Sequence, residues 1–162
     1  MAKSNSNSTA RDFDAQELLA FLRQDELDYP AGAKKFGKEA LPFLSELVQG
    51  SDENLSIKAA YLVGYIDDEA VNDILQMAAE KGSAPVRIAA AFGAQKRGEK
   101  AAESILSKSL EDSDPSVVKF ALRSATAMKM EKTFKSKIDK ISKSFHQDEI
   151  KLDALNMMKR MK

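Results

Sequence analysis

Apolar residues recur at helical spacing along almost the whole chain from Phe13 onward. Near the C-terminus, for example, the apolar positions Phe134, Ile138, Ile141 and Phe145 follow each other at intervals of four, three and four residues. Such spacing places the apolar side chains on one face of an α-helix. No run of alternating β-branched residues is long enough to predict a strand. The pattern therefore predicts an all-α protein of roughly eight to ten helices.

Glycine, proline and polar residues mark the expected helix ends. Gly50 and Gly82 each follow an apolar stripe, and glycine is suited to the left-handed position after a helix. Further along, Asp114 can cap a helix and Pro115 can occupy the first turn of that helix. The connections are therefore short, which favours antiparallel neighbours.

Four of the expected helices begin alike, with a branched aliphatic residue, usually a basic residue next, and then a turn of small side chains. These openings, spaced by 29, 31 and 33 residues, are Ile57-Lys58, Val86-Arg87, Val117-Val118 and Ile150-Lys151. The helix face at positions i, i+3, i+4 and i+7 carries mostly small residues at its last two positions, which lets a neighbouring helix approach closely. The recurrence predicts an array of stacked helix pairs.

Two residues depart from this pattern. Tyr61 occupies a position that is alanine in the three other copies, which predicts that Tyr61 lies in the core. Asp153 stands in the fourth copy where the other copies have alanine or phenylalanine. A carboxylate there predicts a terminal unit with no further neighbour, because the outer face of a capping repeat is polar.

Two of the four copies resemble a known repeat. Segments 83–91 (Ser-Ala-Pro-Val-Arg-Ile-Ala-Ala-Ala) and 114–122 (Asp-Pro-Ser-Val-Val-Lys-Phe-Ala-Leu) are similar to the Asp-Pro-x-Val-Arg-x-x-Ala signature of HEAT repeats, particularly the short variety common in bacteria. The resemblance covers about residues 38–160. It implies a right-handed α-solenoid of about four to five antiparallel helix pairs, whose second helices line a concave surface used mostly for holding other proteins.

The chain is expected to divide into a tail and one domain. Residues 1–12 are mostly small and polar and cannot bury enough apolar area to offset their ordering entropy, which predicts a flexible N-terminal tail. Residues 13–162 are expected to form a single HEAT-like domain, because 162 residues with 43% hydrophobic content suffice for one continuous core. No stretch approaches the roughly 20 apolar residues of a membrane span. We therefore expect a cytoplasmic protein, and the resemblance suggests a bacterial one.

Little in the sequence points to catalysis. The chain has no cysteine, which excludes disulfides, thiolate metal sites and cysteine nucleophiles. His146 is the only histidine, and we interpret it as a solvated turn residue before the last helix, since no Gly-x-Ser-x-Gly elbow accompanies it. The glycines are isolated and never take the spacing of a phosphate-binding loop. We expect no enzymatic activity, no cofactor and no metal ion.

Three carboxylate clusters allow two interpretations. These clusters are Asp52-Glu53, Asp67-Asp68-Glu69 and Asp112-x-Asp114. A metal site built from them would favour a hard cation. Each cluster, however, lies just before or at the start of an expected helix, where acidic side chains cap free amides and complement the helix dipole. Helix capping is the favoured interpretation.

The basic residues that open the repeat helices, Lys58, Arg87 and Lys151, also allow two interpretations. They could form a ladder of charges along the concave face that reaches toward an acidic partner. The HEAT resemblance implies instead that such residues pair with loop aspartates of the next repeat, here Asp68 or Asp114. The structural role is favoured.

Other residues are better candidates for partner contact. Lys119 and Arg123 lie one turn apart on a polar face of the third repeat helix. Tyr65 either looks into the groove or packs under the turn at Asp67, and tyrosine and arginine anchor many interfaces. The candidate partner-binding residues are Lys58, Tyr65, Arg87, Lys119, Arg123 and Lys151.

The net charge of zero hides an asymmetry. Residues 1–82 carry 8 basic and 15 acidic residues, residues 83–116 carry 5 and 5, and residues 117–162 carry 12 and 5. In a linear array the two ends would then have opposite charge. The basic end could steer an anionic partner, and complementary ends could favour head-to-tail contact. Alternatively, the lysines only solvate one helix: Lys132, Lys135, Lys137, Lys140 and Lys143.

The sequence thus favours a non-enzymatic scaffold or adaptor that binds a protein or peptide on the concave face. One alternative is nucleic-acid binding through the basic C-terminal third, which would depend strongly on salt. Another is an accessory factor similar to HEAT-like bilin lyases, which rests on the analogy of fold alone. We expect no membrane partner, and either a monomer or weak head-to-tail self-association.

Overall fold

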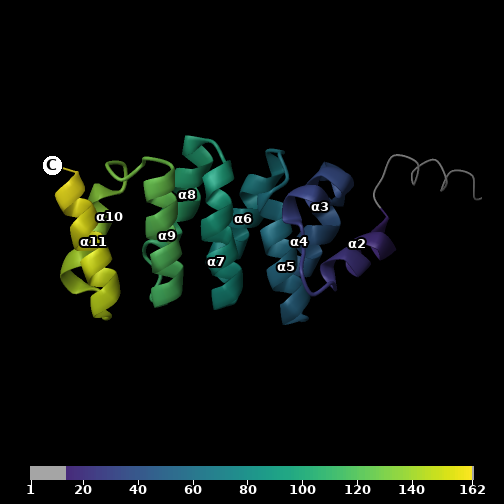
Figure 1. Cartoon of the computed structure of the whole chain (residues 1–162), viewed down its shortest axis with the longest axis horizontal. Helices are drawn as coiled ribbons and strands as arrows, with labels where there is room; N and C mark the ends of the chain where they lie inside the picture. The colour runs from purple at the N-terminus through teal and green to yellow at the C-terminus, as the bar shows by residue number, and fades with distance from the viewer. Residues whose placement is uncertain (1–13, 162) are drawn as a thin grey trace, which may run out of the picture.

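The computed structural model describes residues 14–161, which form ten α-helices and two 3-10 helices and contain no strand (Figure 1). The all-α prediction is confirmed. The expected tail, residues 1–12, lies outside the described residues. No helix in the described range is long and apolar enough to cross a membrane. The elements are α2 (Ala15–Leu22), α3 (Tyr29–Phe36), η1 (Lys38–Ala40), α4 (Leu41–Gln49), α5 (Glu53–Gly64), α6 (Ala70–Lys81), α7 (Ala84–Gly93), η2 (Ala94–Lys96), α8 (Glu99–Ser109), α9 (Pro115–Ala127), α10 (Lys135–Ser144) and α11 (Asp148–Arg160).

From α4 onward the helices form two layers in sequence order along the long axis (Figure 1). The front layer consists of α5, α7, α9 and α11, and each of these helices contacts the next. The back layer consists of α4, α6, α8 and α10. We call each back helix, together with the front helix that follows it, a unit. At one end of the array α2 and α3 contact α5, and at the other end lie α10 and α11.

Aspartate side chains accept hydrogen bonds from backbone amides at the starts of five helices, α2, α3, α5, α6 and α9. Three of these aspartates belong to the carboxylate clusters of the sequence analysis. Asp52 Oδ1 accepts a hydrogen bond from the backbone N–H of Leu55 at 3.1 Å, at the start of α5. Asp114 Oδ1 accepts from the N–H of Val117 at 3.1 Å, at the start of α9. Asp68 accepts from the first N–H of α6 at 2.9 Å. The capping interpretation of the carboxylate clusters is confirmed for these three residues.

The caps define the register of the repeat. The N-cap residues of α5, α7, α9 and α11 are Asp52, Ser83, Asp114 and Gln147, which lie 31, 31 and 33 residues apart. The third position after each N-cap is a buried aliphatic residue: Leu55, Val86, Val117 and Ile150. The seventh position is an alanine with no exposed surface: Ala59, Ala90, Ala121 and Ala154.

This register corrects the first copy by two residues. The repeat begins with Leu55 and not with Ile57, because the capping aspartate and not the aliphatic residue fixes the start of the helix. Tyr61 is therefore not equivalent to alanine. It falls at the ninth position, with Phe92 and Arg123, and it is half-buried. The prediction that Tyr61 lies in the core is wrong.

Small residues bring the front helices into close contact, as the sequence predicts. A Cβ atom on Gly64 would lie 3.0 Å from the Cα atom of Gly93, so α5 and α7 touch backbone to backbone there. Between α7 and α9, the Ser124 hydroxyl donates to the Ala91 carbonyl at 2.8 Å and accepts from the Gln95 amide at 3.0 Å. The front layer is thus held by close packing together with a few buried polar contacts.

Replacing Gly64 with alanine is expected to destabilise the protein by about 1–3 kcal/mol, because the added methyl group forces α5 and α7 apart. Urea unfolding followed by circular dichroism measures the change. Gly98→Ser is the control, because a Cβ atom on Gly98 meets nothing within 4 Å and serine is a good N-cap for α8. A Gly64→Ala protein as stable as the wild type would contradict the close approach.

Candidate functional site

Arg87 connects two neighbouring units. Its Nε donates to Oδ2 of Asp112 at 2.7 Å, a terminal nitrogen donates to Oδ1 at 3.1 Å, and the other donates to the Gly82 carbonyl at 2.9 Å. The hydrogen bonds to Asp112 raise the pKa of Arg87. The expected tie between repeats is therefore present, but its acceptor is Asp112, since Asp114 caps α9. Arg87 is directed to its own fold and not to a partner.

The three lysines among the candidates differ from one another. Lys58 Nζ donates to the backbone carbonyl of Gln24 at 2.8 Å, so it ties α5 to the turn between α2 and α3. Lys119 lies 3.7 Å from the Glu149 carboxylate, at the start of α11. Lys151 is half-buried, and its ammonium has no ion pair or hydrogen bond with any other described residue. Lys58 and Lys119 therefore link neighbouring elements of the fold.

Arg97 is an inter-unit tie that the sequence analysis misses. From the turn after α7, its guanidinium donates to the carbonyls of Gly64, Ile66 and Asp68, at 3.1–3.4 Å. A cation suits the end of α5, where carbonyl groups lack helical partners. Burial lowers the pKa of Arg97. No sequence signal marks this residue, because it lies outside the repeated helix start.

Aromatic rings from three helices gather on the front layer. Tyr29 of α3 stacks on Tyr65 with ring centroids 6.0 Å apart and planes 3° apart. Tyr61 lies 5.8 Å from Tyr29, and Phe92 of α7 lies 6.1 Å from Tyr61 and 6.2 Å from Tyr65. Lys96 Nζ sits 4.7 Å above the Tyr65 ring, within the range of a cation–π interaction. Tyr65 thus packs against other rings.

Tyr61, Tyr65 and Phe92 belong to a longer surface, which we call the front stripe. It consists of the fifth, ninth and thirteenth positions after each front N-cap, all of them exposed or half-buried. None of the positions is a carboxylate, and aromatic or aliphatic residues at α5 and α7 give way to basic residues toward α9 and α11. The members are Ile57, Tyr61, Tyr65, Ile88, Phe92, Lys96, Lys119, Arg123, Ala127, Leu152, Asn156 and Arg160.

The front stripe is hollowed between α9 and α11. A cleft of about 430 Å³ opens there, with Arg123 and Arg160 at its walls and a single carboxylate, Asp153. The Arg123 guanidinium lies 5.4 Å from the centre of the Phe120 ring. Of the six candidate residues, Tyr65, Lys119 and Arg123 are members of the front stripe. It does not include Lys58, Arg87 or Lys151.

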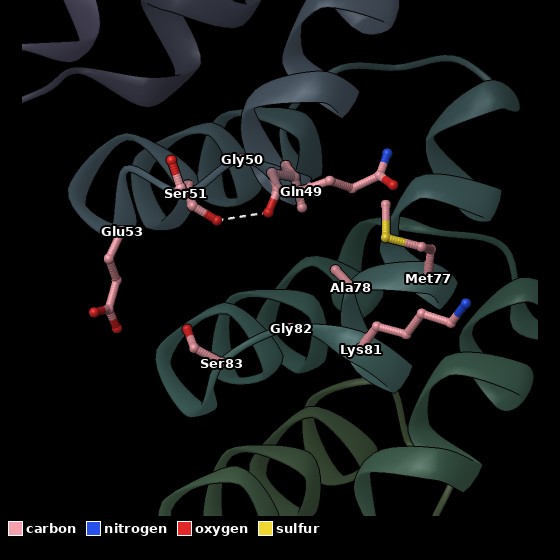
Figure 2. A pocket seen from close by; sticks show the side chains of 11 residues that line it. Gln49, Gly50, Ser51, Glu53, Met77, Ala78, Lys81, Gly82 and Ser83 are labelled. Carbon is pink, nitrogen blue, oxygen red and sulfur yellow. Dashed lines mark hydrogen bonds between the residues drawn. The ribbon is translucent and has the colours of Figure 1, made fainter.

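The contact made by Arg87 and Asp112 is not repeated at the preceding unit junction. The equivalent residues there are Ser56 and Lys81. The Ser56 hydroxyl donates to the Val48 carbonyl at 2.6 Å instead. A cleft of about 400 Å³ opens between the turn around Gly50 and the end of α6 (Figure 2). This junction therefore lacks an ion pair between the residues equivalent to Arg87 and Asp112, and Arg97 supplies a polar contact elsewhere in it.

The junction that follows is also open. Val118 and Phe145 stand in place of Arg87 and Asp112. A cleft of about 460 Å³ lies between the turn that precedes α9 and the turn that precedes α11. Lys137 and Glu111 form an ion pair at its wall, which lowers the pKa of Glu111. His146 is an exposed turn residue, as predicted, and its Nε2 lies 2.8 Å from the Ser113 carbonyl.

Neither a metal site nor similarity to other proteins points to a function. Within residues 14–161, no three histidine, cysteine, aspartate or glutamate side chains are grouped to hold a metal ion. Comparisons with protein-family models, with curated proteins and with solved structures gave no match. The surfaces of the protein therefore carry the functional argument.

The tie between Arg87 and Asp112 is expected to stabilise the protein measurably, because its side chains are only 23% and 10% exposed. We expect Arg87→Met and Asp112→Asn each to cost about 1–3 kcal/mol, between the values for exposed and buried pairs. A double-mutant cycle in urea should show that the two costs are coupled. The more exposed pair of Lys108 and Glu80 is the control, with a much smaller coupling. Equal couplings for the two pairs would contradict the assignment.

The aromatic cluster predicts a loss of stability at alkaline pH. Burial, followed by the neighbouring tyrosines, raises the pKa of Tyr29, and burial raises that of Tyr61. Above the ordinary tyrosine pKa of about 10, the unfolded chain loses protons that the folded protein keeps, so stability should fall as pH rises toward the raised values. Urea unfolding over this range measures the slope. The slope should be shallower in the Tyr29→Phe/Tyr61→Phe protein, and an unchanged slope would contradict the shifts.

Proposed function

We propose that this protein is a non-enzymatic adaptor that binds a protein or peptide along the front stripe. In this proposal the two layers are a right-handed HEAT-like α-solenoid of about four to five helix pairs, in the cytoplasm of a bacterium. Three features support this architecture: the regular spacing of the N-caps, the proline in the first turn of α7 and α9, and the buried alanine seven residues after each front N-cap.

The composition of the front stripe carries the proposal. A chain with 25 acidic and 25 basic residues places no carboxylate at any stripe position. The stripe instead offers half-buried tyrosine and phenylalanine rings, which already pack against one another and lose little entropy on binding, together with arginines. Aromatic and arginine side chains are enriched in the energetic centres of protein interfaces. A partner segment with apolar residues toward α5 and acidic residues toward α9 fits this order.

Nucleic-acid binding is the second candidate, and the exposed lysines of α10 favour it. Lys135, Lys140 and Lys143 are exposed there, although Lys143 pairs with Asp139 at 3.0 Å. The aromatic rings lie at the opposite end of the array from these lysines (Figure 1). Stacking and phosphate contact would therefore be separated, whereas proteins that bind single strands combine them in one groove.

A photo-crosslinking residue placed at Phe92 tests the proposal. In native cells we expect a discrete protein adduct at this position and none at Glu103, an exposed control position on α8 in the back layer. Adding Arg123→Glu should reduce the adduct by about tenfold, because loss of an interface arginine costs more than 1 kcal/mol. Equal adducts at Phe92 and Glu103, or an adduct unchanged by Arg123→Glu, would refute binding at the stripe. An adduct with nucleic acid alone would favour the second candidate.

A further inference from the structure

Helix α11 exposes two leucines, and at the position of one of them, Leu155, the other front helices have buried residues. Leu152 is 56% exposed and Leu155 is 40% exposed. No other large apolar side chain in residues 14–161 is as exposed as these two. Leu152 is a member of the front stripe, whereas Leu155 is not, and the half-buried Met158 follows Leu155 one turn later. Exposed leucines this close together on one helix usually mark a contact surface.

The register identifies this surface as the one that each front helix offers to the next. Leu155 is at the eighth position after its N-cap, and the equivalents Ala60, Ala91 and Leu122 are 0%, 0% and 3% exposed. Met158 is at the eleventh position, where the other front helices have fully buried residues: Val63, Ala94 and Ala125. In α5, α7 and α9 a further front helix packs against the helix that carries these positions, and Ser124 of α9 binds the carbonyl of Ala91 directly. No front helix follows α11 among the described residues, and there Leu155 is exposed and Met158 is half-buried.

Lys151 completes the same surface with a charge. It stands at the fourth position after its N-cap, which is the position of Arg87 in α7. Arg87 uses this position to bind Asp112 in the turn of the following unit. Lys151 has no ionic partner among the described residues. The end of the array therefore offers an apolar patch beside a cation, which is what the interior junction at α7 offers to α9.

We propose that this end face, formed by Lys151, Leu155 and Met158, binds the N-terminal end of a second copy of the chain. Charge complementarity selects this occupant. Residues 14–53 carry 4 basic and 9 acidic residues, and residues 129–161 carry 9 basic and 5 acidic residues. The acidic N-terminal end of one molecule therefore attracts the basic C-terminal end of a neighbouring molecule.

The acidic residues lie on the correct edge of the molecule. Asp25 and Glu26 are exposed in the turn between α2 and α3. The hydrogen bond from Lys58 to the Gln24 carbonyl holds this turn beside the first part of α5. Lys151 lies in the first part of α11. The acidic turn and Lys151 therefore both lie near the N-terminal ends of front helices, on the same edge of the molecule. Stacking a second copy along the axis brings Asp25 and Glu26 toward Lys151.

This contact joins two copies and cannot close on itself within one. The turn between α2 and α3 lies at the opposite end of the array from α11 (Figure 1). The interface pairs two different surfaces, so each bound copy presents a free end face to the next, and linear assemblies form. The inference does not depend on a partner at the front stripe, since the residues of the end face are not members of the stripe.

Sedimentation velocity of the full chain over a range of concentrations tests the proposal. We expect the average sedimentation coefficient to rise with concentration and to fall on adding salt, which screens the exposed charges. Lys151→Glu/Leu155→Glu and Asp25→Lys/Glu26→Lys should each raise the dissociation constant at least about tenfold. Glu99→Lys/Glu103→Lys on α8 is the control for the acidic-turn variant, because it makes the same charge change on exposed residues away from both ends, and it should keep wild-type association.

Mixing the two end variants distinguishes the possible pairings. The protein with the altered end face keeps a normal N-terminal end, and the protein with the altered acidic turn keeps a normal end face. Each is expected to be monomeric alone, and the equimolar mixture is expected to form a 1:1 dimer that grows no further, which also shows that both variants are folded. A wild type that stays monomeric overturns the proposal. Undiminished association of Asp25→Lys/Glu26→Lys alone also overturns it, because the end face would then bind another end face.

Discussion

The seventh residue of every front helix, a fully buried alanine, sets the spacing on which the other contacts depend. With no side chain larger than a methyl group at this position, neighbouring helices come close enough for the glycines of α5 and α7 to touch and for Ser124 to reach the Ala91 carbonyl. At the eighth position the same interface holds Ala60, Ala91 and, in α9, Leu122, but no aromatic ring. The tyrosines and Phe92 lie on the front stripe because the interface between front helices has no room for such rings.

Each junction between units shares this packing but has its own polar contacts. The α7 to α9 junction has the paired hydrogen bonds of Arg87 with Asp112, whereas the junctions on either side have clefts at the equivalent place. In a linear array, stability is close to a sum of unit and junction contributions. The centre should accordingly be the part that opens least readily, and the outer units should open first. The cleft between α9 and α11 on the front stripe lies at one of these weaker junctions.

Helical class, helix caps and close packing could be predicted from the sequence because each depends on residues a few positions apart. The alanine at the fourth position after Val86, Val117 and Ile150 is an example. The first copy was misplaced because Leu55 and Ile57 are both aliphatic, and only the hydrogen bond from Leu55 to Asp52 distinguishes them. The Arg97 tie and the Tyr29 stack could not be predicted, since their partners lie some 30 residues away and no motif marks either residue. Arg87 binds Asp112 and not Asp114, because the Asp114 carboxylate already accepts hydrogen bonds from the backbone at the start of α9.

The order of units along the chain gives the surface a direction. Because each unit contacts only its neighbours, a change in sequence composition becomes a change along the axis, and the front stripe passes from rings at α5 to guanidinium groups at α9 and α11. A segment bound along the stripe would therefore meet different chemistry at its two ends, which favours one orientation over the reverse. The end face follows from the same property. A repeat that stacks on its successor through positions four, eight and eleven retains those positions in α11, where they are Lys151, Leu155 and Met158, and Leu155 is 40% exposed.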